Sequence, residues 1–219
     1  ELSRINRDAA REPVALSNEM FVLLVQAQRF SQFSHGAFDI TYASAGCLYD
    51  YREGVAPSAA ALAQGREAIG WKNLVLDART RSVRFAREGM RIDLGGFAKG
   101  HAVDNAAAIL MRHGIHHAHV AAGGDSRVIG DKRGRPWTIG VRDPRKADGL
   151  AVLLALADTA ISTSGDYERF FEKNGIELVS VTCTGFDTDD NIGRVPAEAF
   201  IDATMSAERS GADAIFISC

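Results

Sequence analysis

The sequence lacks several features that would place a protein in a broad class at once. Its 219 residues contain no apolar run near the ~20 residues that span a bilayer. With 25 lysines and arginines against 28 aspartates and glutamates, the net charge of -3 points to neither nucleic acid nor an anionic membrane. The three cysteines are widely spaced and odd in number, so they indicate neither a disulfide framework nor a metal knuckle. No internal repeat is visible.

The composition is that of a globular protein, with 46% apolar and 24% charged residues. The length fits one domain, or one domain plus a fragment. Short predicted strands dominate and helices interrupt them irregularly, which favours an α+β fold over a repeating βαβ sheet. The patterns predict a loop over 2–16, helices over 18–33, 57–65 and 97–113, and strands at 74–76, 83–85, 90–94, 117–121, 137–142, 150–156 and 159–163.

The segment 93–104 reads DLGGFAKGHAVD and is the first candidate site. Asp93 ends a predicted strand, Gly95 and Gly96 allow backbone to approach a ligand, and a helix follows. Free N–H groups at a helix start suit phosphate, and Lys99 would add a positive charge to the same anion. The alternative is a simple tight turn with a solvated lysine.

A second glycine pair, Gly123 and Gly124, follows another predicted strand and precedes Asp125. It implies a second close approach of backbone to a ligand, although a plain turn capped by Asp125 explains it as well. The hydroxyl-rich segment 162–170 would donate to phosphate or to a ring carbonyl, or would simply cap a helix. Two glycine sites in one chain favour a single ligand lying between them.

Aromatic and histidine residues supply two further candidates. Tyr49 and Tyr51 flank Asp50 and would stack on a flat ring, or be half-buried surface residues. His117 and His119 share one face of a predicted strand, so a metal pair is geometrically possible there. No carboxylate or cysteine nearby in the sequence completes that set.

Taken together, these segments resemble the ApbE family, the FAD:protein FMN transferases. Residues 93–104 resemble its DLGGxAKGxxxD signature. Five other segments resemble family motifs in the same order, and the resemblance covers about residues 1–175. These five read ELSRIN at 1–6, GAFDIT at 36–41, AGGD at 122–125, WTIGVRDP at 137–144 and SGDYERFF at 164–171.

The resemblance implies an enzyme that binds FAD with Mg²⁺ and cuts its pyrophosphate. It transfers FMN to a Ser or Thr of an acceptor flavoprotein and releases AMP. Such a displacement at phosphorus needs positioning and neutralisation of charge. The family also implies a periplasmic location or one on the outer face of the cytoplasmic membrane, which the chain itself does not reveal.

The resemblance also implies roles for individual residues, while leaving the catalytic residue unassigned. Asp93 would bind the flavin nucleotide, and Gly96 would offer its carbonyl to the metal. The other implied contacts to the flavin nucleotide come from an aromatic segment, one lysine and a glycine pair, namely Tyr49, Asp50, Tyr51, Lys99, Gly123 and Gly124.

Two departures from the family bear on activity. The strand and helix that open the family are missing, and the chain is therefore expected to be truncated at both ends. The HxxDPxTG segment and a later Asp and Thr that complete the metal site are also missing, since residues 202–204 read DAT at too short a spacing. A flavin-binding remnant without catalysis is therefore the alternative function.

The last part of the sequence, residues 176–219, resembles a different family. Its segments 189–196 and 210–219 are similar to the Asp/Glu racemase superfamily, in the maleate isomerase and arylmalonate decarboxylase branch. The chain would then be an ApbE-like domain over 1–175 and a short α/β fragment over 176–219, joined by a gene fusion or an assembly artefact. A third possible function is a cysteine-dependent isomerase at Cys219, against a terminal thiol without function.

Overall fold

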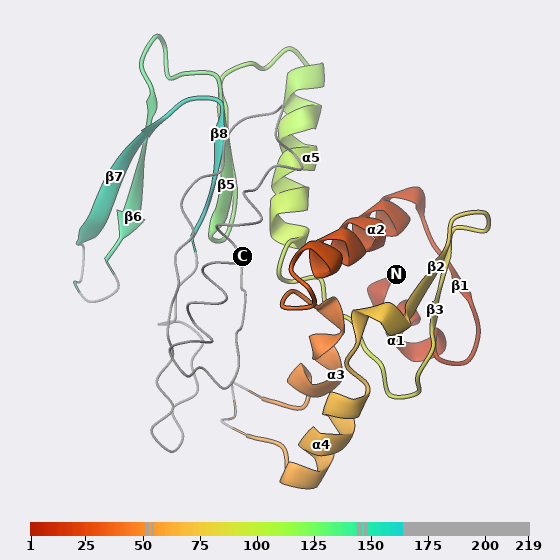
Figure 1. Ribbon diagram of the computed structural model, residues 1–219. Coiled ribbons are helices and arrows are strands. Elements are labelled where there is room, and N and C mark those ends of the chain that lie inside the picture. The colour runs from red at the N-terminus through yellow and green to blue at the C-terminus, as the bar shows by residue number, and fades with distance from the viewer. Residues whose placement is uncertain (51–52, 54, 144–145, 147–148, 164–219) are drawn as a thin grey trace. The chain divides into compact units, whose positions relative to one another are not determined.

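The computed structural model describes residues 1–50, 53, 55–143, 146 and 149–163, which belong to two compact units (Figure 1). Unit 1 comprises residues 1–94, and unit 2 begins at Gly95. Tyr51, the SGDYERFF segment and the racemase-like residues 176–219 with Cys219 lie outside the described residues.

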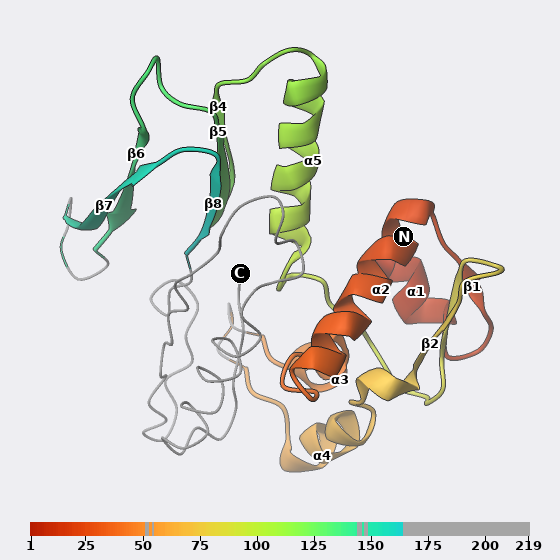
Figure 2. The same cartoon turned by 45° about the horizontal axis from the view of Figure 1, so that its top comes forward.

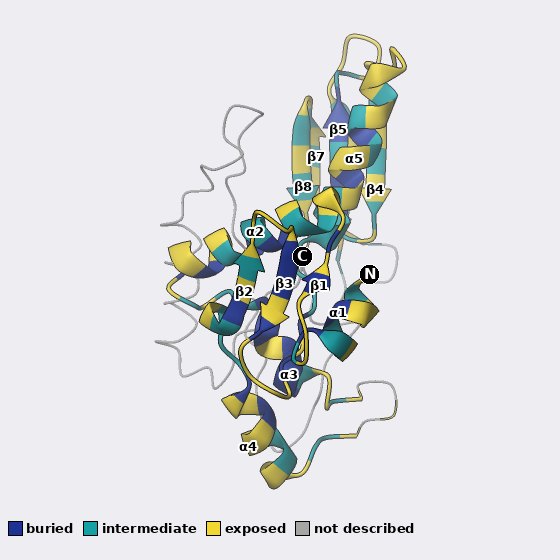
Figure 3. Cartoon of the chain, turned by 90° about the vertical axis from the view of Figure 1, so that its right-hand side faces the viewer, coloured by how far each residue is buried: buried dark blue, intermediate teal, exposed yellow. Residues whose placement is uncertain are grey.

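Unit 1 combines helices with one small antiparallel sheet. Strand β3 is the middle strand, and its buried residues make it the darkest strand of this sheet in Figure 3. Val83 and Phe85 of β3 are 0% and 2% exposed and form the centre of the core of this unit. The elements are α1 (Leu2–Asp8), β1 (Val14–Ala15), α2 (Asn18–Phe33), the 3-10 helix η1 (Ile40–Tyr42), α3 (Ala43–Gly46), α4 (Ala59–Glu67), the 3-10 helix η2 (Trp71–Asn73), β2 (Leu74–Asp77) and β3 (Ser82–Phe85).

Helix α2 forms where the sequence predicts it, because strong local signals fix both of its ends. The Ser17 hydroxyl accepts a hydrogen bond from the Met20 N–H at 3.1 Å, which caps the first turn. Leu24 and Ala27 are fully buried on the face that packs on the core. After the helix, Gly36 adopts a positive φ of 93°, which glycine tolerates without strain.

The loop predicted over residues 2–16 is wrong, since this segment contains α1 and β1. Ile5 is the one buried residue of α1, so a helix of this length shows no repeating apolar face in the sequence. Strand β1 is two residues long and pairs with β3 through Val14 and Val83. Neither element carries a periodic signal long enough to detect.

The strand predicted at residues 90–94 is also wrong, although its alternating burial is real. Met90, Ile92 and Leu94 are 2%, 1% and 5% exposed. The segment is extended but joins no ladder, because side chains satisfy its backbone instead. Asn6 bonds both the N–H and the carbonyl of Ile92, at 2.8 and 2.9 Å, and Ser44 Oγ accepts from the Arg91 N–H at 3.0 Å.

The described part of unit 2 contains one long helix, a three-stranded sheet and a separate two-stranded hairpin, β6–β7. Helix α5 lies beside β4 and β5 in both views of Figures 1 and 2. The sheet has the antiparallel order β4-β5-β8, and β6 pairs with β7. The elements are α5 (Ala98–Arg112), β4 (Ala118–Ala122), β5 (Asp125–Ile129), β6 (Trp137–Arg142), β7 (Leu150–Leu156) and β8 (Thr159–Ser162).

Most elements of unit 2 agree with the prediction, with two differences. Helix α5 lies one residue inside the predicted range at each end, and Gly114 follows it with a φ of 76°, where the Ile115 N–H bonds the Leu110 carbonyl at 3.0 Å. Its buried face is formed by Val103 and Ala107, whereas Ala102 and Ile109 are exposed. The central strand β5 was missed, because its polar start conceals it.

Candidate functional site

Asp93 is held at a fixed place in unit 1 by its neighbours on both sides. Its backbone N–H donates to the Ile40 carbonyl at 3.0 Å, and Tyr42 Oη donates to Asp93 Oδ1 at 3.3 Å. Ile92, the preceding residue, is anchored to Asn6 of α1 as described above. A flavin-binding role for Asp93 therefore starts from a carboxylate whose backbone is firmly tethered.

The GAFDIT segment provides the support for this arrangement. Asp39 Oδ1 accepts from the Thr41 N–H at 2.8 Å and from Thr41 Oγ1 at 2.6 Å, and Asp39 Oδ2 accepts from the Trp71 N–H at 2.9 Å. These bonds cap η1 and hold Ile40 and Tyr42, both of which form hydrogen bonds with Asp93. Asp39 is thus a positioning residue for this part of the site.

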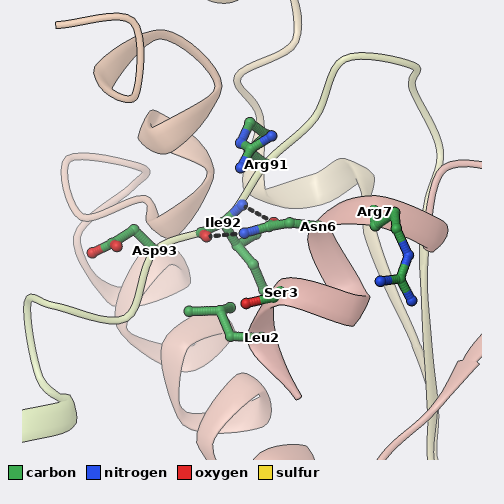
Figure 4. A pocket seen from close by; sticks show the side chains of 7 residues that line it. All are labelled: Leu2, Ser3, Asn6, Arg7, Arg91, Ile92 and Asp93. Atoms are coloured by element: carbon green, nitrogen blue, oxygen red, sulfur yellow. Dashed lines mark hydrogen bonds between the residues drawn. The ribbon is translucent and has the colours of Figure 1, made fainter. Parts of the chain in front are cut away.

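A shallow pocket of about 290 Å³ lies beside Asp93, between α1 and the extended segment (Figure 4). Arg7 in its wall is engaged by Asp8, with two bonds of 2.9 Å. The hydrogen bond from Arg7 keeps the pKa of Asp8 below its ordinary value. The pocket is lined by Leu2, Ser3, Asn6, Arg7, Arg91, Ile92 and Asp93.

Tyr49 and Asp50 belong to a different part of unit 1. Asp50 forms an isolated bridge with Val55, with both backbone bonds at 2.9 Å, and its Oδ1 accepts from the Glu53 N–H at 3.1 Å. Among the residues that the structure describes, neither Tyr49 nor Asp50 lines the pocket beside Asp93. Their contact with a flavin stays a prediction.

The remaining predicted site residues lie in unit 2, around the start of α5. Phe97 precedes this helix, and its side chain makes no capping hydrogen bond to the first turn. A Cβ built on Gly123, whose φ is 63°, would lie 3.8 Å from Lys99 Cδ. The Gly-Gly turn and Lys99 therefore lie side by side, whereas Gly96 lies in the turn before the helix.

Gly124 is required by close packing. A Cβ on Gly124 would lie 2.4 Å from the carbonyl oxygen of Thr163, which no side chain tolerates. The Thr163 N–H and Oγ1 both donate to the Gly124 carbonyl, at 2.9 and 3.1 Å. The turn between β4 and β5 is thereby fastened to the end of β8.

Asp125 is more than the turn cap that the sequence suggested as an alternative. It is 4% exposed, and its Oδ1 accepts from Ser162 Oγ at 2.6 Å. Its Oδ2 is buried and has no hydrogen-bond partner among the residues that the structure describes. Sequence reasoning missed this residue as a functional candidate, since only the fold reveals its burial.

The histidine pair is not assembled as a metal site. His117 precedes β4, and its Nδ1 lies 2.8 Å from the Asp131 carbonyl oxygen. The His119 ring lies with its centroid 6.5 Å from that of Trp137, tilted by 41°. Within the described parts of the chain, no group of three His, Cys, Asp or Glu side chains is placed to hold a metal ion.

The family model of the ApbE family matches residues 1–206 of the chain. The chain belongs to the ApbE family. This match runs past residue 175, the predicted end of the ApbE-like domain. The racemase resemblance of residues 176–219 stays a prediction.

Two relatives carry the description FAD:protein FMN transferase. The protein from Treponema pallidum is 28% identical over 237 aligned residues, which cover 100% of this chain and 64% of the relative. That from Vibrio cholerae is 33% identical over 183 residues, covering 80% of this chain and 54% of the relative. The chain thus spans less than two thirds of the length of either protein.

Solved structures agree with the family and with the predicted α+β fold. The ApbE protein from Thermotoga maritima superposes with a TM-score of 0.72 at 36% identity, over 80% of this chain and 58% of that one. The flavin transferase ApbE from Vibrio cholerae gives 0.69 at 28% identity, over 80% and 57%. In the part of the chain that the structure describes, no helix has the length and apolarity needed to cross a membrane.

Proposed function

We propose that this chain forms the flavin-nucleotide site of an FAD:protein FMN transferase. In this reaction the enzyme binds FAD, breaks its pyrophosphate bond, transfers FMN to a Ser or Thr of an acceptor flavoprotein and releases AMP. The observation that carries the proposal is the segment 93–104, which begins with the tethered Asp93 and continues through a glycine turn into α5.

Each unit contains groups that would contact a different part of FAD. In unit 1, the Asp93 carboxylate, which accepts a hydrogen bond from Tyr42 Oη, would accept another from the nucleotide. In unit 2, Lys99 and the N-terminal end of α5 would suit the negative charge of a pyrophosphate. At Gly123 the nearest atom to a built Cβ is Lys99 Cδ at 3.8 Å, so backbone there would approach the ligand beside Lys99.

The proposed Mg²⁺ rests on the family resemblance and on Gly96, which has only a carbonyl oxygen to offer. Mg²⁺ prefers six oxygen ligands in octahedral geometry. The described residues contain no cluster of three acidic, histidine or cysteine side chains that would supply such a set. Because Mg²⁺ in proteins keeps several waters and binds substrate phosphates, Gly96 would supply one oxygen ligand of such a site.

The test is a fluorescence titration of the purified chain with FAD, with and without Mg²⁺, followed by measurement of AMP release. Saturable binding that Asp93→Ala weakens about tenfold supports the proposal, since a hydrogen bond to a charged group has that size. Glu88→Ala, which removes an exposed carboxylate of the same unit, is the matched control. No saturable binding by folded wild-type protein would overturn the proposal.

Two outcomes of AMP release separate the proposed enzyme from the alternative. Release that depends on Mg²⁺ supports a transferase. FAD binding without AMP release supports the alternative, a flavin-binding remnant without catalysis.

The partner and compartment follow as parts of the same proposal. The partner is an acceptor flavoprotein with a Ser or Thr site, and the location is periplasmic or on the outer face of the cytoplasmic membrane. Fractionation of cells that produce the full-length protein tests the location.

A further inference from the structure

Asp125 occupies an unusual electrostatic position in the sheet of unit 2. It opens the central strand β5 and is 4% exposed, yet one carboxylate oxygen has no partner in the described residues. A buried polar atom without a hydrogen bond costs free energy, and native structures keep few of them. The atom therefore needs an explanation, such as a ligand that supplies the missing donor.

The fold places this carboxylate beside the proposed nucleotide-binding elements. Side chains alternate along a strand, so Asp125 and Arg127 share one face of β5. Arg127 bonds Asp104 of α5 at 3.0 Å, which identifies this face as the one that α5 covers. Asp125 lies two residues before Arg127 along the strand, a distance of about 6 Å, and the four residues before Asp104 along the helix span about the same distance. Asp125 therefore lies level with the first turn of α5.

The Gly-Gly turn gives an independent view of the same neighbourhood. Gly123 lies next to Lys99 of the first α5 turn, which agrees with the alignment of α5 and β5. Ser162 orients the carboxylate by donating to its Oδ1 at 2.6 Å, and leaves Oδ2 as the acceptor that is not used. One oxygen is thus bonded within the protein, and the other is buried without a hydrogen-bond partner among the described residues.

We infer that Asp125 is a nucleotide-binding residue whose Oδ2 accepts a hydrogen bond from a hydroxyl or N–H group of bound FAD. The inference rests on the proposed function. A carboxylate repels phosphate, so the donor belongs to the sugar or ring portion of FAD, which carries both hydroxyl and N–H groups. Lys99 and the start of α5 remain for the phosphates.

The decisive variant is Asp125→Asn, which keeps the shape and replaces one acceptor oxygen by a donor NH₂ group. Asp158→Asn is the matched control, because Asp158 has a positive φ of 48° that asparagine tolerates and precedes β8, at the end opposite Ser162. Both variants are titrated with FAD in Mg²⁺ and in EDTA, at a temperature where circular dichroism shows them fully folded.

The expected result is at least tenfold weaker FAD binding by Asp125→Asn in both buffers, with Asp158→Asn unchanged. Without ligand, the melting temperature of Asp125→Asn is expected to equal or exceed that of the wild type, because an unpaired buried charge is removed. Titration with AMP and with riboflavin then assigns the donor to one half of FAD.

Binding by Asp125→Asn within twofold of the wild type would overturn this inference while leaving the proposed function intact. A loss confined to the Mg²⁺ buffer would also overturn it, since Asp125 would then be a metal ligand. Failure of the wild type itself to bind FAD would instead overturn the proposed function, and this inference with it.

Discussion

The two units hold their site residues by different means. In unit 1, the segment around Asp93 is extended but lies outside any ladder, and side chains of Asn6 and Ser44 bond its backbone. In unit 2, the turn with Gly123 and Gly124 closes the β4–β5 hairpin, whose register runs from Ala118 and Ile129 to Ala122 and Asp125. Side-chain support depends on single residues, whereas a ladder spreads it over many backbone bonds.

This contrast has a consequence for robustness. Asn6 provides the backbone hydrogen bonds that a neighbouring strand would otherwise provide. When its side chain is removed, no other group in that position makes these bonds. A ladder tolerates most side-chain changes but is sensitive to any atom that forces its turn apart. The Asp93 segment of unit 1 and the glycine turn of unit 2 should therefore fail under different kinds of substitution.

The largest effect is expected for Asn6→Ala. This change leaves the N–H and the carbonyl of Ile92 without partners, and Ile92 is 1% exposed. We expect a loss of about 3 kcal/mol in the free energy of unfolding, because each unsatisfied buried group costs about 1–3 kcal/mol. Urea unfolding measures it, with the exposed Asn18→Ala as control. A loss below about 1 kcal/mol would contradict side-chain support of this segment.

Gly124→Ala should have the next largest effect on the free energy of unfolding, because it disturbs the turn of the β4–β5 hairpin. Its Cβ would lie 2.4 Å from the Thr163 carbonyl oxygen and force β8 away from the turn. We expect a loss of about 2 kcal/mol, typical of overpacking at a fixed backbone. Gly123→Ala is the matched control, because its Cβ has room and only the φ of 63° is unfavourable, at about 1 kcal/mol. A greater loss for Gly123→Ala in thermal unfolding would refute the packing argument.

The sequence predicts elements whose signals are local. Helix α2 has its cap at Ser17, helix α5 has its stop at Gly114, and β6 and β7 are found at 137–142 and 150–156 as expected. In each case the residues that determine the element lie within it or next to it. Such signals are readable without the fold.

The elements that were missed or wrong depend on partners far along the chain. Residues 90–94 alternate in burial like a strand, but their backbone bonds to Asn6, 86 residues away at Ile92. Strand β5 begins with polar residues that are typical of a turn, and Asp125 is hydrogen-bonded to Ser162, 37 residues away in the sequence. No local pattern reports such pairings.

The candidate site was predictable to a similar extent. The family motifs selected Asp93, Lys99, Gly123 and Gly124, and the structure gives each a defined neighbourhood. Whether they bind a flavin stays a prediction. Asp125 could not be singled out from the sequence, because its burial and its unsatisfied oxygen are properties of the folded unit.

A smaller effect is expected where unit 2 does rely on side chains. Asp104→Asn breaks the 3.0 Å pair with Arg127, whose side chain is 17% exposed while that of Asp104 is 53% exposed. We expect a loss below about 1 kcal/mol, since partly exposed ion pairs are weak and screened. The melting temperature difference from the wild type should shrink in 1 M salt. A difference that is unaffected by salt would exclude an ionic contribution.

The smallest effect on stability is expected in the β2–β3 hairpin of unit 1. Its strands form a ladder, and the side chain of Asp77 supports the turn between them. The Asp77 carboxylate accepts from the Arg79 N–H at 2.8 Å and the Thr80 N–H at 3.3 Å. Hydrogen bonds, first from the Arg79 N–H and then from Thr80, lower the pKa of Asp77. A carboxyl whose pKa is lower in the folded state stabilises the fold above its unfolded pKa, and this contribution is lost as pH falls through the folded pKa.

Asp77→Asn keeps an acceptor oxygen but cannot titrate. The difference in melting temperature between wild type and Asp77→Asn should therefore shrink as the pH falls from about 5 toward 2, around the ordinary aspartate pKa of about 3.9. Glu88→Gln, an exposed carboxylate of the same unit, is the control. If the difference for Asp77→Asn stays constant across this range, the turn is held by shape alone and its charge contributes nothing. If it shrinks, even a hairpin ladder of unit 1 draws on a side chain, which extends the contrast with the glycine turn of unit 2.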